Sequence, residues 1–160
     1  KVSVPDPDNL AFVTQTTLSV DDTTEIISIL QRRFPNIEAP RKEDICYATT
    51  NRQAAVKDLA DECEAMIVLG APNSSNSNRL AEVALTIGCP KSILIQRAAE
   101  LEDGWLDGVS TLGITAGASA PEILVQELID SLAAQFEVTV EERNIIDENV
   151  TFSLPRALSA

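Results

Sequence analysis

Hydrophobic residues along this chain fall into short continuous runs separated by stripes with helical spacing. Residues 65–69 read Ala-Met-Ile-Val-Leu, a run typical of a strand that is covered on both faces of its sheet. Apolar runs at 92–95 and 111–115 predict two further strands. The stripe between the first two runs consists of Leu80, Val83, Ala84 and Ile87. This alternation predicts strands joined by helices, with short turns between them.

Residues that start and stop helices flank these stripes. Gly88 follows the stripe above and predicts its C-terminal end. Residues 50–53, Thr-Asn-Arg-Gln, match a capping box, and Ser119 matches an N-cap with Glu122 three residues later. The sequence therefore predicts helices that open at Thr50 and at Ser119. The expected buried residues are Val56, Leu59 and Cys63 in the first helix, and Ile123, Leu124, Leu128 and Leu132 in the second.

The N-terminal region has a pattern of its own. A Pro- and Asp-rich lead-in, residues 1–10, precedes a short strand predicted from Phe12 to Thr17. Ser19, followed by two aspartates, predicts the N-cap of a helix. The apolar stripe expected in that helix is Ile26, Ile27, Leu30 and Phe34. Residues 36–42 then form a connector, which is the best candidate for a domain boundary.

Composition and charge narrow the class of protein. A chain of 160 residues, 44% hydrophobic and 23% charged, fits one globular domain or two small ones. No apolar run reaches the roughly 18–20 residues that cross a bilayer, so no membrane segment is expected. The net charge of −13 repels phosphate backbones, so nucleic acid is not an expected partner. The absence of histidine excludes Ser-His-Asp catalysis, Cys-His catalysis and His-ligated zinc in this chain alone.

The three cysteines, an odd number, occur in a chain whose start carries no export signal. This favours a reducing compartment, so a cytoplasmic location is expected. Cys46 lies just before a predicted helix N-terminus, where a lowered pKa suits a thiolate ligand or nucleophile; the alternative is a small buried hydrophobe. Cys63 lies on an apolar stripe and Cys89 in a turn, so both are expected to be structural.

Hydroxyl and amide side chains gather at three expected strand-to-helix turns, at 16–17, at 74–76 and at Ser119. In open α/β sheets, ligands bind beyond the carboxyl ends of the strands, where helix N-termini attract anions. Together these turns would form a phosphate cradle that needs no lysine or arginine. Each of these sites taken alone is better explained by helix capping than by ligand binding. Residues 73–78, six Asn and Ser in a row, exceed what a cap requires.

Four segments carry a resemblance to a known enzyme family, and they are 14–19 (TQTTLS), 44–53 (DICYATTNRQ), 73–80 (NSSNSNRL) and 115–119 (TAGAS). In this order they resemble 4-hydroxy-3-methylbut-2-enyl diphosphate reductase, the last enzyme of the non-mevalonate isoprenoid pathway. The resemblance implies that the chain corresponds to about the C-terminal half of the family's full length.

The fold that this resemblance implies is α/β, with parallel-sheet, three-layer lobes. Three such lobes would surround a 4Fe–4S cluster pseudo-symmetrically, and this chain would hold one complete lobe and part of another. Residues 1–40 would form the C-terminal part of the middle lobe and residues 41–145 the C-terminal lobe. Residues 146–160 would form a tail that returns toward the absent N-terminal lobe.

The resemblance also implies roles for single residues. Cys46 matches the last of three cysteine ligands of the cluster, the other two of which lie in the absent half. Thr16 matches a threonine near the hydroxymethyl end of the substrate, where it takes part in hydrogen bonding and proton delivery; it is the candidate catalytic residue. Thr16 is also a candidate substrate-binding residue, and the residues that match the family's diphosphate-binding set are Ser74, Ser75, Asn76 and Ser119.

The implied reaction is the reductive dehydroxylation of 4-hydroxy-3-methylbut-2-enyl diphosphate to isopentenyl and dimethylallyl diphosphate, with ferredoxin or flavodoxin as the electron donor. Because one thiolate of three cannot hold the cluster, the chain by itself is expected to be colourless and inactive. Two alternatives stay open. One is a stand-alone, non-redox phosphate-binding α/β module that uses the same turns, and the other is a fragment with no activity of its own.

Overall fold

A computed structural model of the chain describes residues 3–146 and residue 151. Most of the proposed tail, residues 146–160, therefore lies outside the described residues. The elements in chain order are α1 (Val20–Arg33), α2 (Tyr47–Ala60), β1 (Ala65–Leu69), α3 (Ser75–Ile87), β2 (Ser92–Ile95), a 3-10 turn η1 (Ala98–Glu100), β3 (Leu112–Ala116) and α4 (Glu122–Ala133). None of the helices in the described part is long and apolar enough to cross a membrane.

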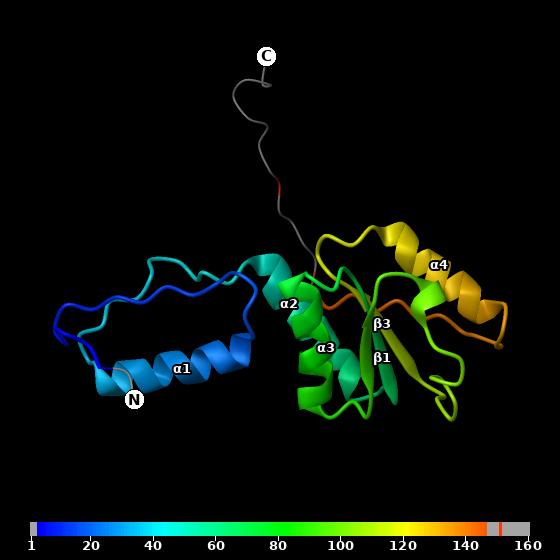
Figure 1. Cartoon of the computed structure of the whole chain (residues 1–160), viewed down its shortest axis with the longest axis horizontal. Coiled ribbons are helices and arrows are strands. Elements are labelled where there is room, and N and C mark those ends of the chain that lie inside the picture. The colour runs from blue at the N-terminus through cyan, green and yellow to red at the C-terminus, as the bar shows by residue number, and fades with distance from the viewer. Residues whose placement is uncertain (1–2, 147–150, 152–160) are drawn as a thin grey trace, which may run out of the picture.

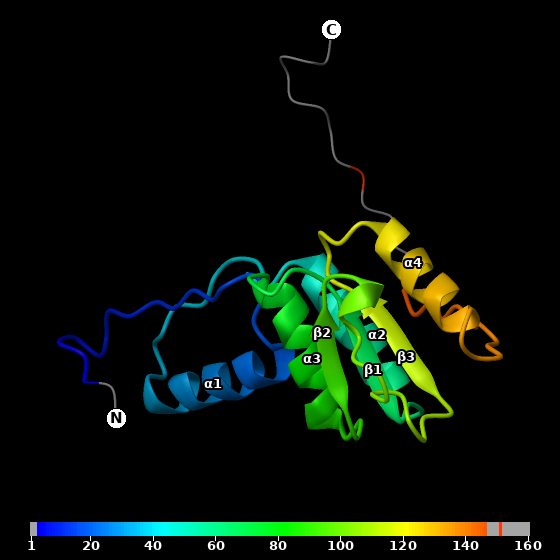
Figure 2. The ribbon, with the colours of Figure 1, turned by 45° about the vertical axis from the view of Figure 1, so that its right-hand side comes forward.

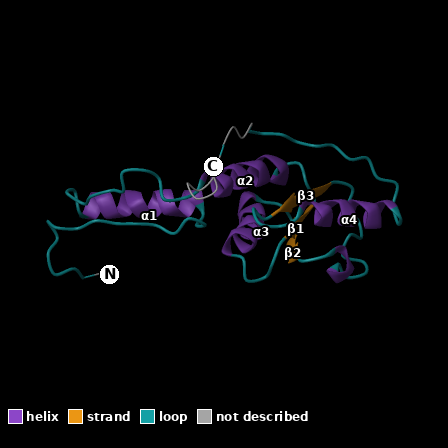
Figure 3. Cartoon of the chain, turned by 90° about the horizontal axis from the view of Figure 1, so that it is seen from above, coloured by secondary structure: helices purple, strands orange, loops and turns teal. Residues whose placement is uncertain are grey.

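The three strands form one parallel sheet with the order β2-β1-β3. All five residues of the central strand β1 are buried, as its unbroken apolar run predicts. Its side chains alternate between two cores. Met66 and Val68 pack against the face covered by α2 and α3, whereas Ile67 and Leu69 pack against α4. The result is a three-layer α/β body, which Figure 3 shows from above, and the predicted fold class is confirmed.

All three helices of this body begin at the same edge of the sheet, where the strands end (Figure 1). We call this the C-terminal edge of the sheet. α3 ends at Gly88, which adopts the left-handed conformation (φ 120°) and confirms the predicted stop. Leu80, Val83 and Ala84 of α3 are buried, as the stripe predicts. The helix N-termini therefore point toward one region, a requirement for a shared anion site.

Residues 3–46, which we call the N-terminal arm, project from the α/β body (Figures 1 and 2). The arm consists of α1 and of two extended segments that run alongside it. These segments are joined at one bridge, Ala11 to Glu38, so the predicted strand from Phe12 to Thr17 is wrong. A strand needs a regular ladder along its length, but the segment makes only separate backbone-to-backbone bonds, at Glu38 and from the Cys46 amide to the Thr16 carbonyl.

Helix α1 begins as predicted, because the Ser19 hydroxyl accepts a hydrogen bond from the Asp22 amide at 3.2 Å. Its apolar stripe is only partly covered. Phe34 is buried and Ile27 and Leu30 are half-buried, but Ile26 is 56% exposed, so that part of the prediction is wrong. The described residues place no layer over this side of the helix.

Helix α2 begins at Tyr47 with Cys46 as its N-cap, three residues before the predicted start at Thr50. The capping box is not formed. The Thr50 hydroxyl donates to the Cys46 carbonyl, and the Gln53 side chain turns away toward the arm. Gln53 is 1% exposed; its amide donates to the Leu18 carbonyl at 2.8 Å and accepts from the Val20 amide at 3.0 Å. The buried Gln53 side chain thus connects the start of α1 to the α/β body by two hydrogen bonds.

We expect Gln53→Leu to destabilise the chain by about 1–3 kcal/mol, because it leaves the Leu18 carbonyl and the Val20 amide without partners. Urea denaturation measures the change, and hydrogen exchange should show the loss concentrated in α1. The matched control is Gln126→Leu on exposed α4, which should stay within about 0.5 kcal/mol of the parent chain. Equal losses in both variants would contradict the role of Gln53.

Helix α4 starts at Glu122 with Pro121 at the N-cap position, so the prediction that Ser119 caps this helix is wrong. Ser119 instead lies in a turn closed by the bond from the Ala120 amide to the Gly117 carbonyl. Leu128 and Leu132 are buried as predicted, but Ile123 is 61% exposed. The Ser119 hydroxyl is therefore not used by its own helix.

Candidate functional site

The first turn of α3 holds three of the candidate residues at the C-terminal edge. Ser74 is the N-cap, and its hydroxyl accepts from the Ser77 amide at 3.3 Å and from the Ser77 hydroxyl at 3.0 Å. The Asn78 amide donates to the carbonyls of Pro72 and Ser74, which fixes the turn before the helix. Ser75 is exposed at the first helical position. The Ser77 and Asn78 amides are thus bonded within the turn. The first N–H groups of a helix have no partner within it.

Asn76 is the most informative member of this turn. Its side chain is 7% exposed, yet neither its amide nitrogen nor its oxygen has a hydrogen-bond partner. Burying an amide without partners costs about 1–3 kcal/mol, so such groups are uncommon unless a ligand or water completes them. At a helix N-terminus, the amide N–H groups are placed to donate to an anion.

Two glycines bring the ends of β1 and β3 close to this turn. A Cβ atom on Gly70 or on Gly117 would overlap the Ser77 hydroxyl. The Cβ position of Gly117 also lies 3.8 Å from the amide nitrogen of Asn76. The turn that contains Ser119 begins at Gly117, so this turn starts beside the first turn of α3.

Thr16 and Cys46 form a second pair. The Cys46 amide donates to the Thr16 carbonyl at 3.2 Å, and both side chains are exposed. Among the described residues, no hydrogen bond joins this pair to Ser74, Ser75, Asn76 or Ser119. The two groups are nevertheless on the same side of the body, because α2 and α3 pack side by side and begin at the same edge (Figure 1).

The surroundings of the Cys46 thiol lower its pKa. Its sulfur lies 3.2 Å from the Thr49 hydroxyl, and this hydrogen bond is the main cause that lowers the pKa of Cys46 below its usual value. Bonds from backbone N–H groups of the first turn of α2 lower the pKa further, against a smaller opposing effect of burial. Cys46 is thus an exposed N-cap thiol whose thiolate is favoured.

We expect Thr49→Val to raise the pKa of Cys46, because it removes the hydrogen bond that stabilises the thiolate most. The thiolate fraction at pH 7 falls, so iodoacetamide should alkylate Cys46 severalfold more slowly and the rate–pH profile should move to higher pH. Mass spectrometry of the labelled peptide gives the rate, with buried Cys63 as an internal reference. An unchanged profile would show that Thr49 does not tune the thiol.

Arg52 is a site residue that the sequence analysis did not single out. It lies on α2 less than two turns after Cys46, and its guanidinium donates to the Ala116 carbonyl at the end of β3, at 3.1 Å. This bond joins the helix that starts with the thiol to the strand that leads into the Ser119 turn. The sequence could have pointed to Arg52, because it is a basic residue inside the segment 44–53 of a chain with 12 basic residues.

The other cysteines do not add to a metal site. Cys63 and Cys89 are buried in the core under α2 and α3, and the Cys89 thiol donates to the Cys63 and Lys91 carbonyls. Burial raises the pKa of Cys63. Within residues 3–146 and 151, no group of three potential metal ligands comes together. Cys46 therefore fits as one thiolate ligand of an iron–sulfur cluster, whose other ligands must come from outside the described residues.

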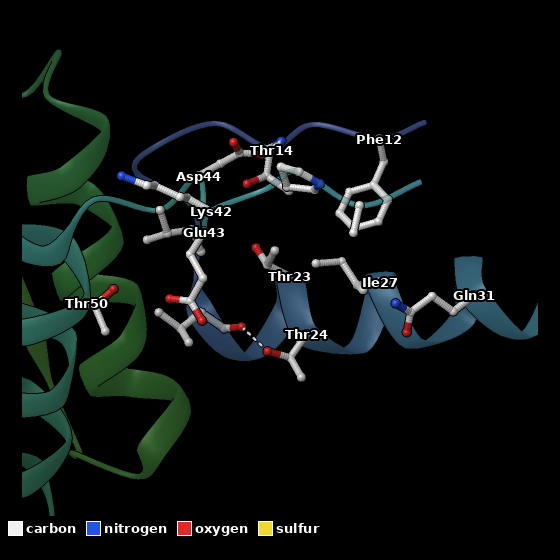
Figure 4. A pocket seen from close by; sticks show the side chains of 14 residues that line it. Phe12, Thr14, Thr23, Thr24, Ile27, Gln31, Lys42, Glu43, Asp44 and Thr50 are labelled. Atoms are coloured by element: carbon white, nitrogen blue, oxygen red, sulfur yellow. Dashed lines mark hydrogen bonds between the residues drawn. The ribbon is translucent and has the colours of Figure 1, made fainter. Parts of the chain in front are cut away.

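A cavity of about 280 Å³ lies elsewhere, between α1 and the two extended segments of the arm. Phe12, Thr14 and Asp44 line it from the segments, and Thr23 and Ile27 line it from α1 (Figure 4). The Thr23 hydroxyl is buried and has no partner. This cavity contains none of the candidate site residues.

The structure is thus a parallel α/β body whose C-terminal edge carries hydroxyls, an unpartnered amide and helix N-termini. Such an arrangement suits an anionic ligand, and an exposed thiol lies on the same side. Comparison with known proteins gives the family. Residues 1–133 match the model of the LytB protein family, and the chain belongs to this family. The resemblance found in the sequence is thereby confirmed.

Curated relatives carry the name 4-hydroxy-3-methylbut-2-enyl diphosphate reductase. Those from Rhodopseudomonas palustris and Psychrobacter sp. are both 58% identical, over 96% and 99% of this chain. A solved diphosphate reductase from Plasmodium falciparum is 32% identical, with a TM-score of 0.90 over 98% of this chain and 50% of its own. The chain thus spans about half the length of the relatives that it matches.

Proposed function

We propose that this chain is the diphosphate-binding part of a 4-hydroxy-3-methylbut-2-enyl diphosphate reductase and that it supplies one thiolate to the enzyme's 4Fe–4S cluster. The observation that carries the proposal is the buried, unpartnered amide of Asn76 at the N-terminus of a 13-residue helix. The names of the relatives supply the substrate class and the pathway. A cytoplasmic location and an electron donor of the ferredoxin or flavodoxin type belong to the same proposal.

The diphosphate end of the substrate would bind at the start of α3. The free N–H groups there and the partial positive charge of the helix attract its oxygens. The hydroxyls of Ser74, Ser75 and Ser119 and the amide of Asn76 donate hydrogen bonds to them, and none of the four is a charged group. The net charge of −13 does not prevent this, since charges beyond about 8–10 Å are screened at physiological salt.

The hydroxyl end of the substrate would lie by Thr16 and Cys46. The Thr16 hydroxyl would hydrogen-bond the leaving hydroxyl and pass a proton to it as water departs, which is the role of a proton relay. An iron–sulfur cluster held in part by Cys46 would supply two electrons and a Lewis-acidic iron for this loss of water. The protein's part is to orient the substrate between the two ends.

The complete enzyme needs residues that this chain does not contain. We propose that the complementary, N-terminal half of a LytB polypeptide packs on the arm, where Val13, Ile26 and Ile29 are 84%, 56% and 46% exposed. In this arrangement residues 1–40 belong to a middle lobe, residues 41–145 to the C-terminal lobe, and residues 146–160 return toward the added half.

The test combines the chain with the complementary half of the R. palustris relative under anaerobic reconstitution with iron and sulfide. We expect the pair to show thiolate-to-iron absorption near ~400 nm and to convert 4-hydroxy-3-methylbut-2-enyl diphosphate to isopentenyl and dimethylallyl diphosphate. The chain alone should remain colourless and inactive. A reconstituted pair that binds iron and sulfide but does not consume the substrate would overturn the proposed function.

A second candidate is a non-redox phosphate-binding module. It is favoured by the completeness of the diphosphate candidates, all of which lie at one edge of the described body without any help from Cys46. Reductase activity and diphosphate binding, measured for the parent chain and for Cys46→Ser, separate the two candidates.

A further inference from the structure

The environment of Arg52 resembles that of a ligand-binding arginine more than that of a structural one. One guanidinium nitrogen donates to the Ala116 carbonyl at 3.1 Å, while the Nε atom is buried and has no partner. Arginine is charged at every physiological pH and has five N–H donors. Within the described residues, Arg52 makes no ion pair.

The neighbouring basic residues of α2 and α3, unlike Arg52, form ion pairs with carboxylates. Lys57 pairs with Asp21 at 2.6 Å, and Arg79 pairs with Glu82 at 2.6 Å and with Asp22 at 3.7 Å. These pairs lie where the arm meets the body, so their charges are already compensated. Arg52 is half-buried next to the C-terminal edge, and within the described residues its positive charge has no counterion.

Two unpartnered buried groups therefore meet at the end of β3. Arg52 contacts the carbonyl of Ala116, and the Asn76 amide lies 3.8 Å from the Cβ position of the next residue, Gly117. One group comes from α2 and the other from α3, and both have N–H donors without acceptors. A single anion at this edge would satisfy both.

We propose that Arg52 is the cationic member of the anion site and that it binds a diphosphate oxygen together with Asn76. This inference rests on the proposed function and deepens it, because it adds the only charged group to a set of hydroxyls and amides. Arg52 also bonds to the strand end that leads into the Ser119 turn, so it holds the charge at a fixed position relative to that turn. One diphosphate would then supply hydrogen-bond acceptors for both the Arg52 Nε and the Asn76 amide, which have no partners in the structure.

The test titrates inorganic diphosphate into the full chain and into Arg52→Gln, with calorimetry at two salt concentrations. Loss of a buried charged hydrogen bond should raise Kd by about 10- to 100-fold and reduce the effect of salt on Kd. Arg52→Lys, which keeps the charge, should lose about threefold or less. The control is Arg143→Gln, which removes the same charge beside Glu62, beyond the C-terminal end of α2, and should leave Kd unchanged.

A second measurement needs no variant. Phenylglyoxal modifies exposed arginines, and diphosphate should slow the modification of Arg52 at least severalfold while leaving exposed Arg41 unaffected. Equal Kd values for the parent chain and Arg52→Gln, or an Arg52→Lys variant as weak as Arg52→Gln, would overturn the role of Arg52 and leave the proposed function intact. A parent chain that does not bind diphosphate at all would overturn both.

Discussion

Replacing Cys46 by serine should reduce the reductase activity of the reconstituted enzyme by about 1,000-fold or more, because a serine hydroxyl does not replace a thiolate ligand. The absorption near ~400 nm should be lost with the activity. Diphosphate binding by the chain should be unchanged, since the diphosphate candidates do not contact Cys46. Activity assays, iron analysis and calorimetry of the same preparation measure the three quantities.

The matched control for this variant is Cys89→Ala. Cys89 is 3% exposed and its thiol bonds only to the Cys63 and Lys91 carbonyls, so the change should cost some stability but leave the cluster in place. Full activity in Cys46→Ser would contradict the ligand role. Diphosphate binding by the parent chain, with no reductase activity in the reconstituted parent pair, would favour the non-redox phosphate-binding module instead.

Replacing Gly117 by alanine should destabilise the chain by about 1–3 kcal/mol and abolish diphosphate binding. The added methyl group would overlap the Ser77 hydroxyl and push on the first turn of α3, which carries Ser74 and Asn76. Thermal unfolding gives the stability, and diphosphate titration gives the affinity.

Adding Ser77→Ala to Gly117→Ala should restore much of the stability. The overlap is with the hydroxyl, and the Ser77 Cβ is 3.3 Å from the new methyl group, a tight but tolerable contact. Gly70→Ala provides the contrast, because its methyl group would lie 2.6 Å from the Ser77 Cβ itself. Ser77→Ala should not rescue Gly70→Ala. Rescue of both glycine variants, or of neither, would contradict this account of the turn.

The elements of the α/β body could be predicted because their hydrophobic patterns and their helix-stop residues indicate the same elements. The run at 65–69 is apolar throughout and becomes the buried central strand, and Gly88 stops α3 where the stripe ends. The errors fall at helix starts. Thr50 and Ser119 match capping motifs, but the helices begin at Tyr47 and at Glu122. The Gln53 side chain, which the capping box required, instead forms hydrogen bonds with residues 18 and 20 of the arm.

The exposure of Ile26 was equally unpredictable, because an amphipathic stripe indicates that a helix is covered and not which polypeptide covers it. For the site, residue types and order along the chain were enough to single out Cys46 and the 74–76 turn. The lowered pKa of Cys46 agrees in direction with the expectation from its position before a helix, but its main cause is the Thr49 hydroxyl. Arg52 was missed because its importance lies in a contact with Ala116, 64 residues further along the chain.

The makeup of the anion site has a consequence for its response to acidity. Backbone N–H groups, serine hydroxyls and an asparagine amide do not titrate near neutrality, and a guanidinium stays charged throughout that range. With no histidine in the chain, none of the proposed diphosphate-binding groups changes its charge between mildly acidic and mildly alkaline surroundings. A change in diphosphate affinity across that range would therefore come from the protons on the ligand or from the ionisation of Cys46 on the same side of the body.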